Sequence, residues 1–308
     1  YQTDPTWVRL QDYLPPACRW EADFGPKEDS FRWRNSDVHV ERFANPASPC
    51  KVILHHGVGT NGRLLSLVAG APLARLGFEV AAIDMPFYGM TRNGESGVRW
   101  EDWVRIGAEF VEREVAADGR PVFLYGLSAG GMLAYNVACE TRKVSGIMGM
   151  CFIDAGSPVA RMRMSDRPRM DEVAFKMLGA MPDSVLRRLR VPMKHLVKMK
   201  ALVNDDRALR ILLKDKHSAG ACVTLEFVDS MIQYKPTIEF EDFDLCPVLL
   251  LQPGEDRWTP FPVTEPFWKR LRAPKQVVTL GNAGHYPIEE PGLTQMRDAM
   301  AAFIRSLS

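Results

Sequence analysis

Ser128 stands between Gly126 and Gly130 in the run VFLYGLSAGG, where an apolar segment gives way to a helix-like pattern. Small residues on both sides allow a sharp strand-to-helix turn, which lifts a serine clear of a sheet. The free N–H groups at the start of the following helix could then stabilise an oxyanion. These residue types at this spacing indicate a nucleophilic serine. A serine that caps the N-terminus of the helix is the simpler alternative.

A serine hydroxyl is a weak nucleophile until a histidine accepts its proton and a carboxylate orients that histidine. His285 follows the apolar run VVTLGNAG, and Asp256 follows VLLLQPGE. Both residues therefore come, like Ser128, after the end of a predicted strand, and the chain order is Ser, Asp, His. Asp154, which follows another apolar run, and Glu255, beside Asp256, are alternative acids.

Apolar runs alternate with amphipathic patterns along most of the chain. Runs such as KVILHH (51–56) and FEVAAIDMP (78–86) have the length and composition of buried strands, and 99–119 has helical spacing. Strands that are apolar nearly throughout and separated by helices predict a parallel sheet covered on both faces. The polar–apolar alternation in 30–46, with a turn at Asn35–Ser36, predicts an antiparallel hairpin at one edge.

This alternation stops in the middle of the chain. From 157 to 240 the sequence shows helical patterns without a convincing strand, and strands resume afterwards. We therefore expect a helical cap, or lid, at 157–240, inserted after the sixth strand of an α/β core that comprises 30–156 and 241–308. Residues 1–29 form an N-terminal arm, whose aromatic side chains could pack on the core or on a second copy in a homodimer.

Charge and length exclude several classes of protein. Among 308 residues, 39 lysines and arginines nearly cancel 38 aspartates and glutamates, which argues against a nucleic-acid partner. The densest basic stretch, 187–200, is interpreted as the solvated face of a helix, with a helix lying on a membrane surface as the alternative. No apolar run is long enough for a membrane span, and no signal peptide is visible.

The six cysteines are scattered, with no C-x-x-C pair and no spacing typical of a metal site. We interpret them as reduced thiols, which together with the absence of a visible signal peptide predicts a cytoplasmic protein. No glycine-rich phosphate loop follows a strand, because GVGTNG at 57–62 lacks the required spacing. The sequence thus predicts neither a metal nor a cofactor.

Five motifs resemble those of the α/β-hydrolase superfamily, and the resemblance covers essentially the whole chain after the N-terminal arm. HHGVG resembles the oxyanion turn of that family, GLSAG its nucleophile elbow, EDRWTP its acid loop and NAGHYPIEEP its histidine loop. DMPFYGMT resembles the D-x-P-G-H-G-x-S loop, with Phe87 and Tyr88 in place of Gly-His. The segment 157–240 is similar to the caps of bacterial lysophospholipases and monoacylglycerol-lipase-like esterases.

The resemblance implies a serine hydrolase with the α/β-hydrolase fold, in which helices flank a mostly parallel twisted sheet. Ser128 resembles the nucleophile, His285 the general base and Asp256 the acid. The backbone N–H groups of Val58 and Ala129 would be the oxyanion donors. The resemblance further implies a carboxylic ester substrate, a small molecule with an apolar acyl or aromatic part, which passes through an acyl-enzyme and needs no cofactor.

Four further residues are expected on the wall of the substrate pocket: Gly57, Leu127, Trp258 and Tyr286. His55 and His56 are expected to shape the oxyanion turn rather than to titrate. The triad leaves the scissile bond open, since it serves an amide, carbamate, lactone or C–C bond equally well. A receptor or scaffold on the hydrolase fold, with a vestigial triad, is a further alternative.

Overall fold

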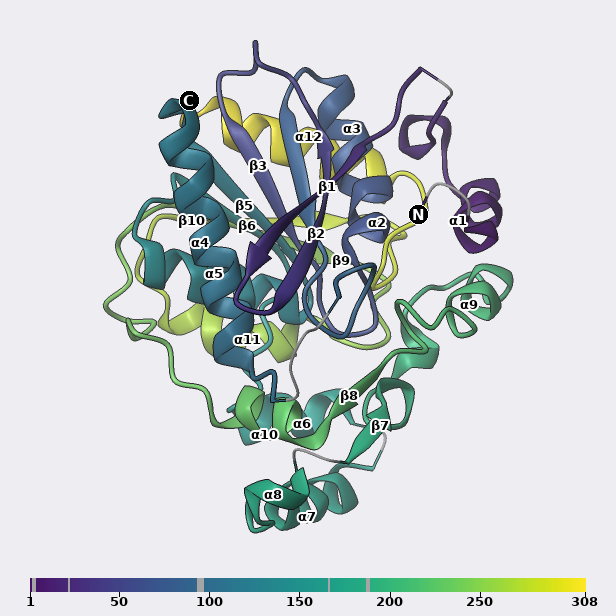
Figure 1. Ribbon diagram of the computed structural model, residues 1–308, viewed down its shortest axis with the longest axis vertical. Coiled ribbons are helices and arrows are strands. Elements are labelled where there is room, and N and C mark those ends of the chain that lie inside the picture. The colour runs from purple at the N-terminus through teal and green to yellow at the C-terminus, as the bar shows by residue number, and fades with distance from the viewer. Residues whose placement is uncertain (2–3, 22, 93–96, 166, 187–188) are drawn as a thin grey trace.

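The computed structural model describes residues 1, 4–21, 23–92, 97–165, 167–186 and 189–308. An eight-stranded sheet crosses the molecule in the order β1-β2-β4-β3-β5-β6-β9-β10 (Figure 1). β2 runs antiparallel to its neighbours β1 and β4, and the five other neighbouring pairs are parallel, which confirms the predicted class. The strands are β1 (Lys27–Trp33), β2 (Ser36–Phe43), β3 (Lys51–His55), β4 (Glu79–Ile83), β5 (Val122–Leu127), β6 (Gly146–Met150), β9 (Val248–Pro253) and β10 (Lys275–Leu280).

Burial explains which strands stand at the centre of the sheet. Every residue of β3, β5 and β9 is buried, as expected for parallel strands covered on both faces. β1 is mostly exposed and forms one edge. The hairpin turn falls at Arg34 and Asn35, one residue before the predicted turn, and Arg34 adopts a left-handed φ of 48° there.

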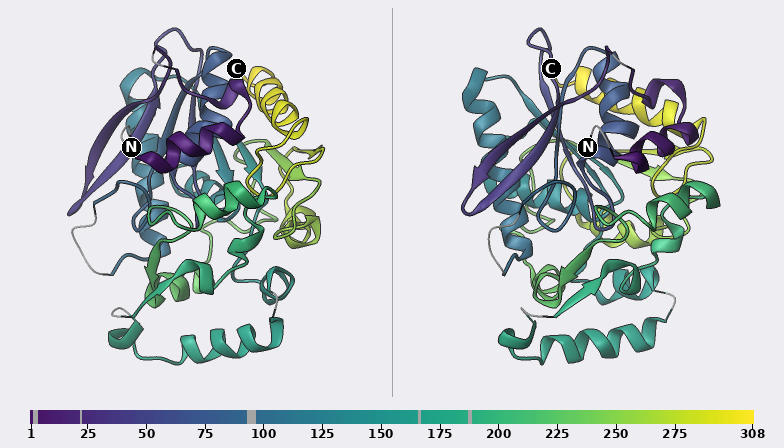
Figure 2. Two further views of the ribbon diagram at one scale, coloured as in Figure 1. Left: turned by 90° about the vertical axis from the view of Figure 1, so that its right-hand side faces the viewer. Right: turned by 45° about the vertical axis from the view of Figure 1, so that its right-hand side comes forward.

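Helices cover both faces of the sheet, as Figures 1 and 2 show. On one face, α3 packs against α12. On the other, α4 packs against α5, and the rings of Tyr135 and Phe267, 5.4 Å apart, join α5 to α11. The bounds of these helices are α2 (Gly62–Leu65), α3 (Ala71–Arg75), α4 (Trp100–Asp118), α5 (Ala129–Thr141), α11 (Phe261–Arg270) and α12 (Gly292–Arg305).

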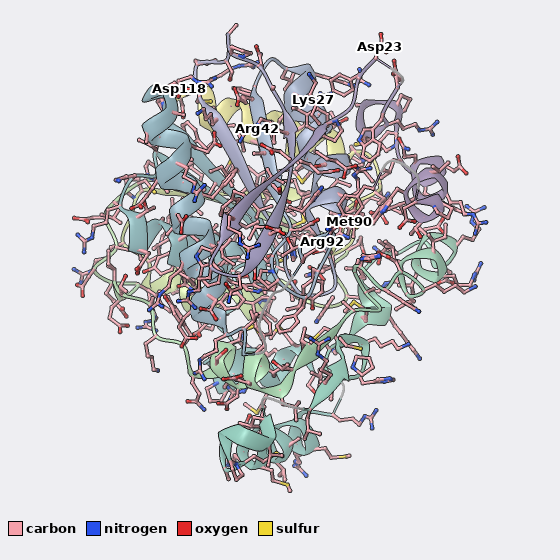
Figure 3. The ribbon with its side chains drawn as sticks, in the orientation of Figure 1. Asp23, Lys27, Arg42, Met90, Arg92 and Asp118 are labelled. Carbon is pink, nitrogen blue, oxygen red and sulfur yellow. The ribbon has the colours of Figure 1, made fainter. Side chains whose placement is uncertain are left out.

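Ion pairs cluster at the amino ends of the parallel strands. Arg42 Nη1 lies 2.9 Å from Glu79 Oε1, and Lys51 Nζ lies 3.1 Å from a Glu114 oxygen and 3.0 Å from an Asp118 oxygen. Figure 3 labels Arg42 and Asp118 in the upper part of the molecule. A functional site in a parallel sheet forms at the opposite end, where the strands finish.

The segment from 157 to 240, here called the cap segment, lies beyond those strand ends, in the lower part of Figure 1 and of both views in Figure 2. It contains a two-stranded antiparallel sheet, so the prediction that no strand interrupts its helices is wrong. Its elements are α6 (Pro158–Met164), α7 (Pro168–Gly179), α8 (Asp183–Leu186), β7 (Arg190–Pro192), α9 (Asp206–Leu212), β8 (Cys222–Thr224) and α10 (Leu225–Gln233).

The basic stretch 187–200 does not form the helix that was expected. Its first two residues lie outside the described residues, and the rest forms β7 and short 3₁₀ turns such as Met193–His195. Pro192 cannot donate a helical hydrogen bond, and Val191 pairs with Val223 of β8 instead. A three-residue strand has no periodicity to read, which is why the sequence pattern missed it.

The N-terminal arm packs on its own chain. Trp7, in α1 (Pro5–Leu10), is buried, and α1 contacts α9 of the cap segment. The guanidinium of Arg63 lies 3.7 Å from the centre of the Trp20 ring. These contacts need no second copy, and self-association stays a prediction. No helix among the described residues has the length and apolar character that crossing a bilayer requires.

Candidate active site

Ser128 follows the end of β5 and lines a cavity of about 830 Å³ between the sheet and the cap segment. Its φ of 61° and ψ of −122° form a strained turn that L residues rarely adopt. A side chain at Gly126 would collide with the backbone of Gly130, and one at Gly130 with the carbonyl oxygen of His55. The glycines thus permit the turn, and Ser128 Oγ is buried there without a hydrogen bond to any described residue.

His285 and Asp256 form a buried pair. Their loops follow β10 and β9, which are neighbours in the sheet, and Asp256 Oδ2 lies 2.9 Å from His285 Nδ1. Burial alone would raise the pKa of Asp256. The charge and hydrogen bond of His285, with hydrogen bonds from Thr259, outweigh burial and hold that pKa well below its ordinary value. Asp256 is therefore ionised at neutral pH and can orient the imidazole.

The sequence analysis considered three carboxylates as the triad acid. Among the described residues, Asp256 is the one of these three that is hydrogen-bonded to His285. Asp154 lies on the cavity wall, where its Oδ1 accepts a hydrogen bond from the N–H of Gly156 at 3.0 Å. Glu255 is exposed. With Nδ1 of His285 engaged by the acid, Nε2 is the ring nitrogen that can accept a proton.

Thr259 is a member of this cluster that the sequence analysis missed. Its Oγ1 lies 2.7 Å from Asp256 Oδ2 and 2.9 Å from His285 Nδ1, so one hydroxyl touches both partners. Cys151 Sγ is 3.6 Å from Asp256 Oδ2, which brings a thiol, a carboxylate and an imidazole together. Burial and the nearby Asp256 raise the pKa of Cys151, so its thiol is protonated at neutral pH.

The turn after β3, which the sequence analysis predicted to be the oxyanion turn, lies against the serine turn. A Cβ atom at Gly57 would stand 2.6 Å from the carbonyl oxygen of Leu127 and 3.1 Å from the amide nitrogen of Ala129, so only glycine fits. Val58 and Ala129 both line the cavity beside Ser128. Ala129 is the first residue of α5, and its N–H therefore has no acceptor within the helix.

Two buried histidines support this turn. Met85 N–H donates to His56 Nε2 at 2.9 Å, so Nδ1 carries the proton and donates to the Gly57 carbonyl oxygen at 2.8 Å. Burial lowers the pKa of His56, which keeps the ring neutral. Burial, and then the adjacent His56, lowers the pKa of His55 to about 3. Both rings are therefore uncharged at neutral pH, the state that the sequence analysis expected.

Only one of the four residues expected on the pocket wall is placed there. Trp258 lines the cavity, and its ring centre lies 4.6 Å from that of His285. Leu127 is buried within β5, and Gly57 contacts the backbone of that strand. The Tyr286 hydroxyl donates to the Leu64 carbonyl oxygen at 2.8 Å, so this ring anchors α2 instead.

The cavity wall includes residues that the sequence analysis did not single out. Asn136 stands eight residues after Ser128 on α5, and its Oδ1 is buried without a hydrogen bond to any described residue. Helical spacing places it on the face of Ser128 and Met132, which could have identified it. The cap segment supplies the run 193–201, whose course depends on the small sheet and could not be read from periodicity.

The molecule thus has the α/β-hydrolase architecture, with a serine on a strained turn and a hydrogen-bonded histidine–aspartate pair in loops that follow strands of one sheet. A family model described as the alpha/beta hydrolase family matches residues 52–301, so the chain belongs to that family. This confirms the resemblance drawn from its motifs. A search of curated protein sequences found no significant match.

Solved structures share the fold. The monoacylglycerol lipase of Paleococcus ferrophilus is 22% identical, with a TM-score of 0.66 over 88% of this chain and 99% of that one. A soluble variant of monoglyceride lipase from Saccharomyces cerevisiae is 15% identical, with a TM-score of 0.73 over 95% and 98% of the two chains. The esterase RhEst1 from Rhodococcus sp. ECU1013 is 19% identical, with a TM-score of 0.61 over 92% and 100%.

Proposed function

We propose that this hydrolase cleaves carboxylic esters through an acyl-enzyme on Ser128. The observation that carries the proposal is the strained turn that presents Ser128 to the cavity. The hydrogen-bonded pair of His285 and Asp256 supports it, because Trp258, which lines the same cavity, has its ring centre 4.6 Å from that of His285. A receptor or scaffold has no need for such a turn, whose strain persists only where the surrounding structure enforces it. Lipases and esterases with the same fold support an ester as the substrate.

In the first half of the reaction, Ser128 Oγ attacks the ester carbonyl carbon while its proton passes to His285 Nε2. The N–H groups of Val58 and Ala129 stabilise the negative charge that develops on the carbonyl oxygen. The C–O bond to the alcohol then breaks, and the alcohol leaves with the proton from His285. Asp256 keeps the imidazole in the tautomer that presents Nε2 to the serine.

In the second half, water attacks the acyl-enzyme. His285 accepts a proton from the water, the carboxylic acid leaves, and Ser128 regains its proton. The hydrogen bond between Ser128 Oγ and His285 forms as substrate fills the cavity, because catalytic hydrogen bonds commonly tighten only in the substrate complex. The cavity of about 830 Å³ is large enough for a drug-sized ester.

Ser128→Ala tests the proposal directly. Turnover of p-nitrophenyl butyrate should fall by about four orders of magnitude or more. A fluorophosphonate probe should modify the wild type at Ser128 and leave Ser128→Ala unmodified, and Ser145→Ala, outside the cavity, serves as the control. Full activity in Ser128→Ala would refute the mechanism. No labelling of the wild type would favour the scaffold, and turnover of p-nitroanilides but not p-nitrophenyl esters would favour an amidase.

A further inference from the structure

The charged side chains on the cavity wall are predominantly positive. Asp154 is the only acid among the described lining residues, whereas six of these residues are cations. The whole chain has a formal net charge of only +1, so the excess is local. The six cations are Arg161, Arg167, Lys194, Lys198, Lys200 and Arg257.

Several of these cations have no carboxylate partner. Arg161 pairs with Glu172 at 3.2 Å, but Lys194, Lys200 and Arg257 have no carboxylate within ion-pair distance among the described residues. The primary structure explains this, since no acidic residue occurs from 184 to 204. Lys194, Lys200 and Arg257 are exposed residues, and unpaired positive charge on one side of a cavity attracts anions. The basic stretch noticed in the sequence thus contributes to the cavity instead of to a solvated helix.

The segment from Lys194 to Lys200, here called the cationic run, is held in place against the loops that carry the candidate catalytic residues. The Met199 side chain packs on Gly59, where an added Cβ atom would lie 2.6 Å from the sulfur, in the turn that carries Val58. Tyr286, directly after His285, donates its N–H to the Leu202 carbonyl oxygen at 2.8 Å. Lys198 and Lys200 flank Met199, so their backbone positions are defined relative to both the oxyanion turn and the histidine loop.

Asn204 adds a third connection to the catalytic loops, since its Nδ2 donates to the carbonyl oxygen of Glu255 at 3.2 Å, beside Asp256. The rest of the wall is largely apolar and includes Met132, Ile153, Val228 and Trp258. A cavity with an apolar lining and a cationic side fits an amphipathic anion. Its volume of about 830 Å³ suits a small molecule better than a polyanion.

We propose that the cationic run of the cap segment, from Lys194 to Lys200, selects esters that carry a carboxylate or phosphate group together with an apolar part. This inference rests on the proposed role of Ser128 as the nucleophile. The anionic group lies against Lys194 and Lys200, and the ester carbonyl lies between Ser128 and the oxyanion turn. The lysines lower KM for anionic esters and leave the chemical step on neutral esters unchanged.

Matched pairs of esters test this selectivity. The carboxylate pair is mono-p-nitrophenyl glutarate against p-nitrophenyl butyrate, and the phosphate pair is an acylglycerol phosphate against the monoacylglycerol with the same acyl chain. The double variant Lys194→Gln/Lys200→Gln should lower kcat/KM for the anionic member by roughly 4- to 25-fold, about two- to fivefold for each exposed charge. High salt should weaken the preference of the wild type. Lys216→Gln, an exposed cap lysine outside the cavity, should change neither ester.

Binding without turnover separates this inference from the mechanism. Decanoate should bind Ser128→Ala more tightly than decanol does, and the double lysine variant should remove the difference in calorimetry. Unchanged ester ratios in the double variant, with Ser128-dependent turnover intact, would overturn the inference and leave the proposed function standing. A lysine effect that appears only with esters presented in anionic vesicles would also overturn it, in favour of a membrane contact. Lysine-dependent decanoate binding without labelling of Ser128 would sustain the cationic site and refute the mechanism.

Discussion

Thr259 Oγ1 lies 2.9 Å from Nδ1 of His285, on the same side of the ring as the carboxylate of Asp256. The same hydroxyl is 2.7 Å from Asp256 Oδ2, and the backbone N–H of Thr259 donates to Asp256 Oδ1 at 2.7 Å. Thr259 therefore constrains both carboxylate oxygens of the acid while it contacts the imidazole. In the proposed mechanism Thr259 is a positioning residue, because its hydroxyl contacts Asp256 and His285 and would act through them and not on the substrate.

Thr259→Val should lower kcat by about 10- to 100-fold with little change in KM, because a hydrogen bond to a charged group contributes about 1.5–3 kcal/mol. Steady-state kinetics on p-nitrophenyl butyrate measure this. Thr259→Ser restores the hydroxyl and should recover most of the loss. If Thr259→Ser is as impaired as Thr259→Val, the methyl group and its packing matter instead of the hydroxyl.

Asp256→Asn should lower kcat by about 10⁴-fold, because an amide cannot hold the imidazole in the required tautomer. Asp154→Asn is the matched control: Asp154 lies on the cavity wall without contact to His285, and its variant should keep kcat within about threefold of wild type. Pre-steady-state acylation rates on the same ester would measure the step directly. The reverse ranking of the two variants would move the acid's role to Asp154.

Much of the candidate active site could be predicted from the sequence, because parallel strands bring their carboxyl ends to one edge of the sheet. Ser128, Asp256 and His285 each follow a strand of one sheet, so sheet geometry favours one edge for all three, and a hydrogen bond joins Asp256 to His285. The strands before Ser128 and Asp256 are buried, whereas β10, before His285, is mostly exposed. Leu127 and Tyr286 were misplaced because which way a side chain points next to a strand end depends on the loop path. Thr259 was missed for the same reason, since its hydroxyl matters only once the acid loop folds back.

The cap segment was the least predictable part of the chain. α9 and α10 have clear helical spacing and were expected, but β7 and β8 are three residues long and have no period to detect. The basic run after β7 contains apolar residues at 193, 196, 197 and 199, and their spacing resembles that of the apolar face of a helix. Pairing with β8 and contacts with three core loops, neither visible in local sequence, decide its course.

Asn136→Leu should raise the free energy of unfolding by about 1 kcal/mol, because a buried unpaired carbonyl oxygen costs about 1–3 kcal/mol and the cavity has room for leucine. Urea denaturation measures the change. Asn136→Asp places an unpaired charge at the same site and should destabilise the fold instead. Destabilisation by both substitutions would mean that the amide is satisfied, for example by an ordered water molecule, and that Asn136 contributes to the fold.

His55 should make the fold sensitive to acid. Its folded-state pKa of about 3 lies below the unfolded value of about 6.5, so below pH 6.5 the unfolded chain binds a proton that the folded chain does not. The free energy of unfolding therefore falls as the pH decreases from about 6.5 towards 3, by about 1.4 kcal/mol for each pH unit. His55→Leu removes this pH dependence. Between neutral pH and pH 5, the free energy of unfolding should therefore fall by about 2 kcal/mol less in the variant than in wild type.

His195→Leu, which changes an exposed imidazole, is the control in urea denaturation at both pH values. Equal acid sensitivity of wild type and His55→Leu would show that His55 is protonated in the folded protein, so that the burial of an uncharged ring under the oxyanion turn would have to be abandoned.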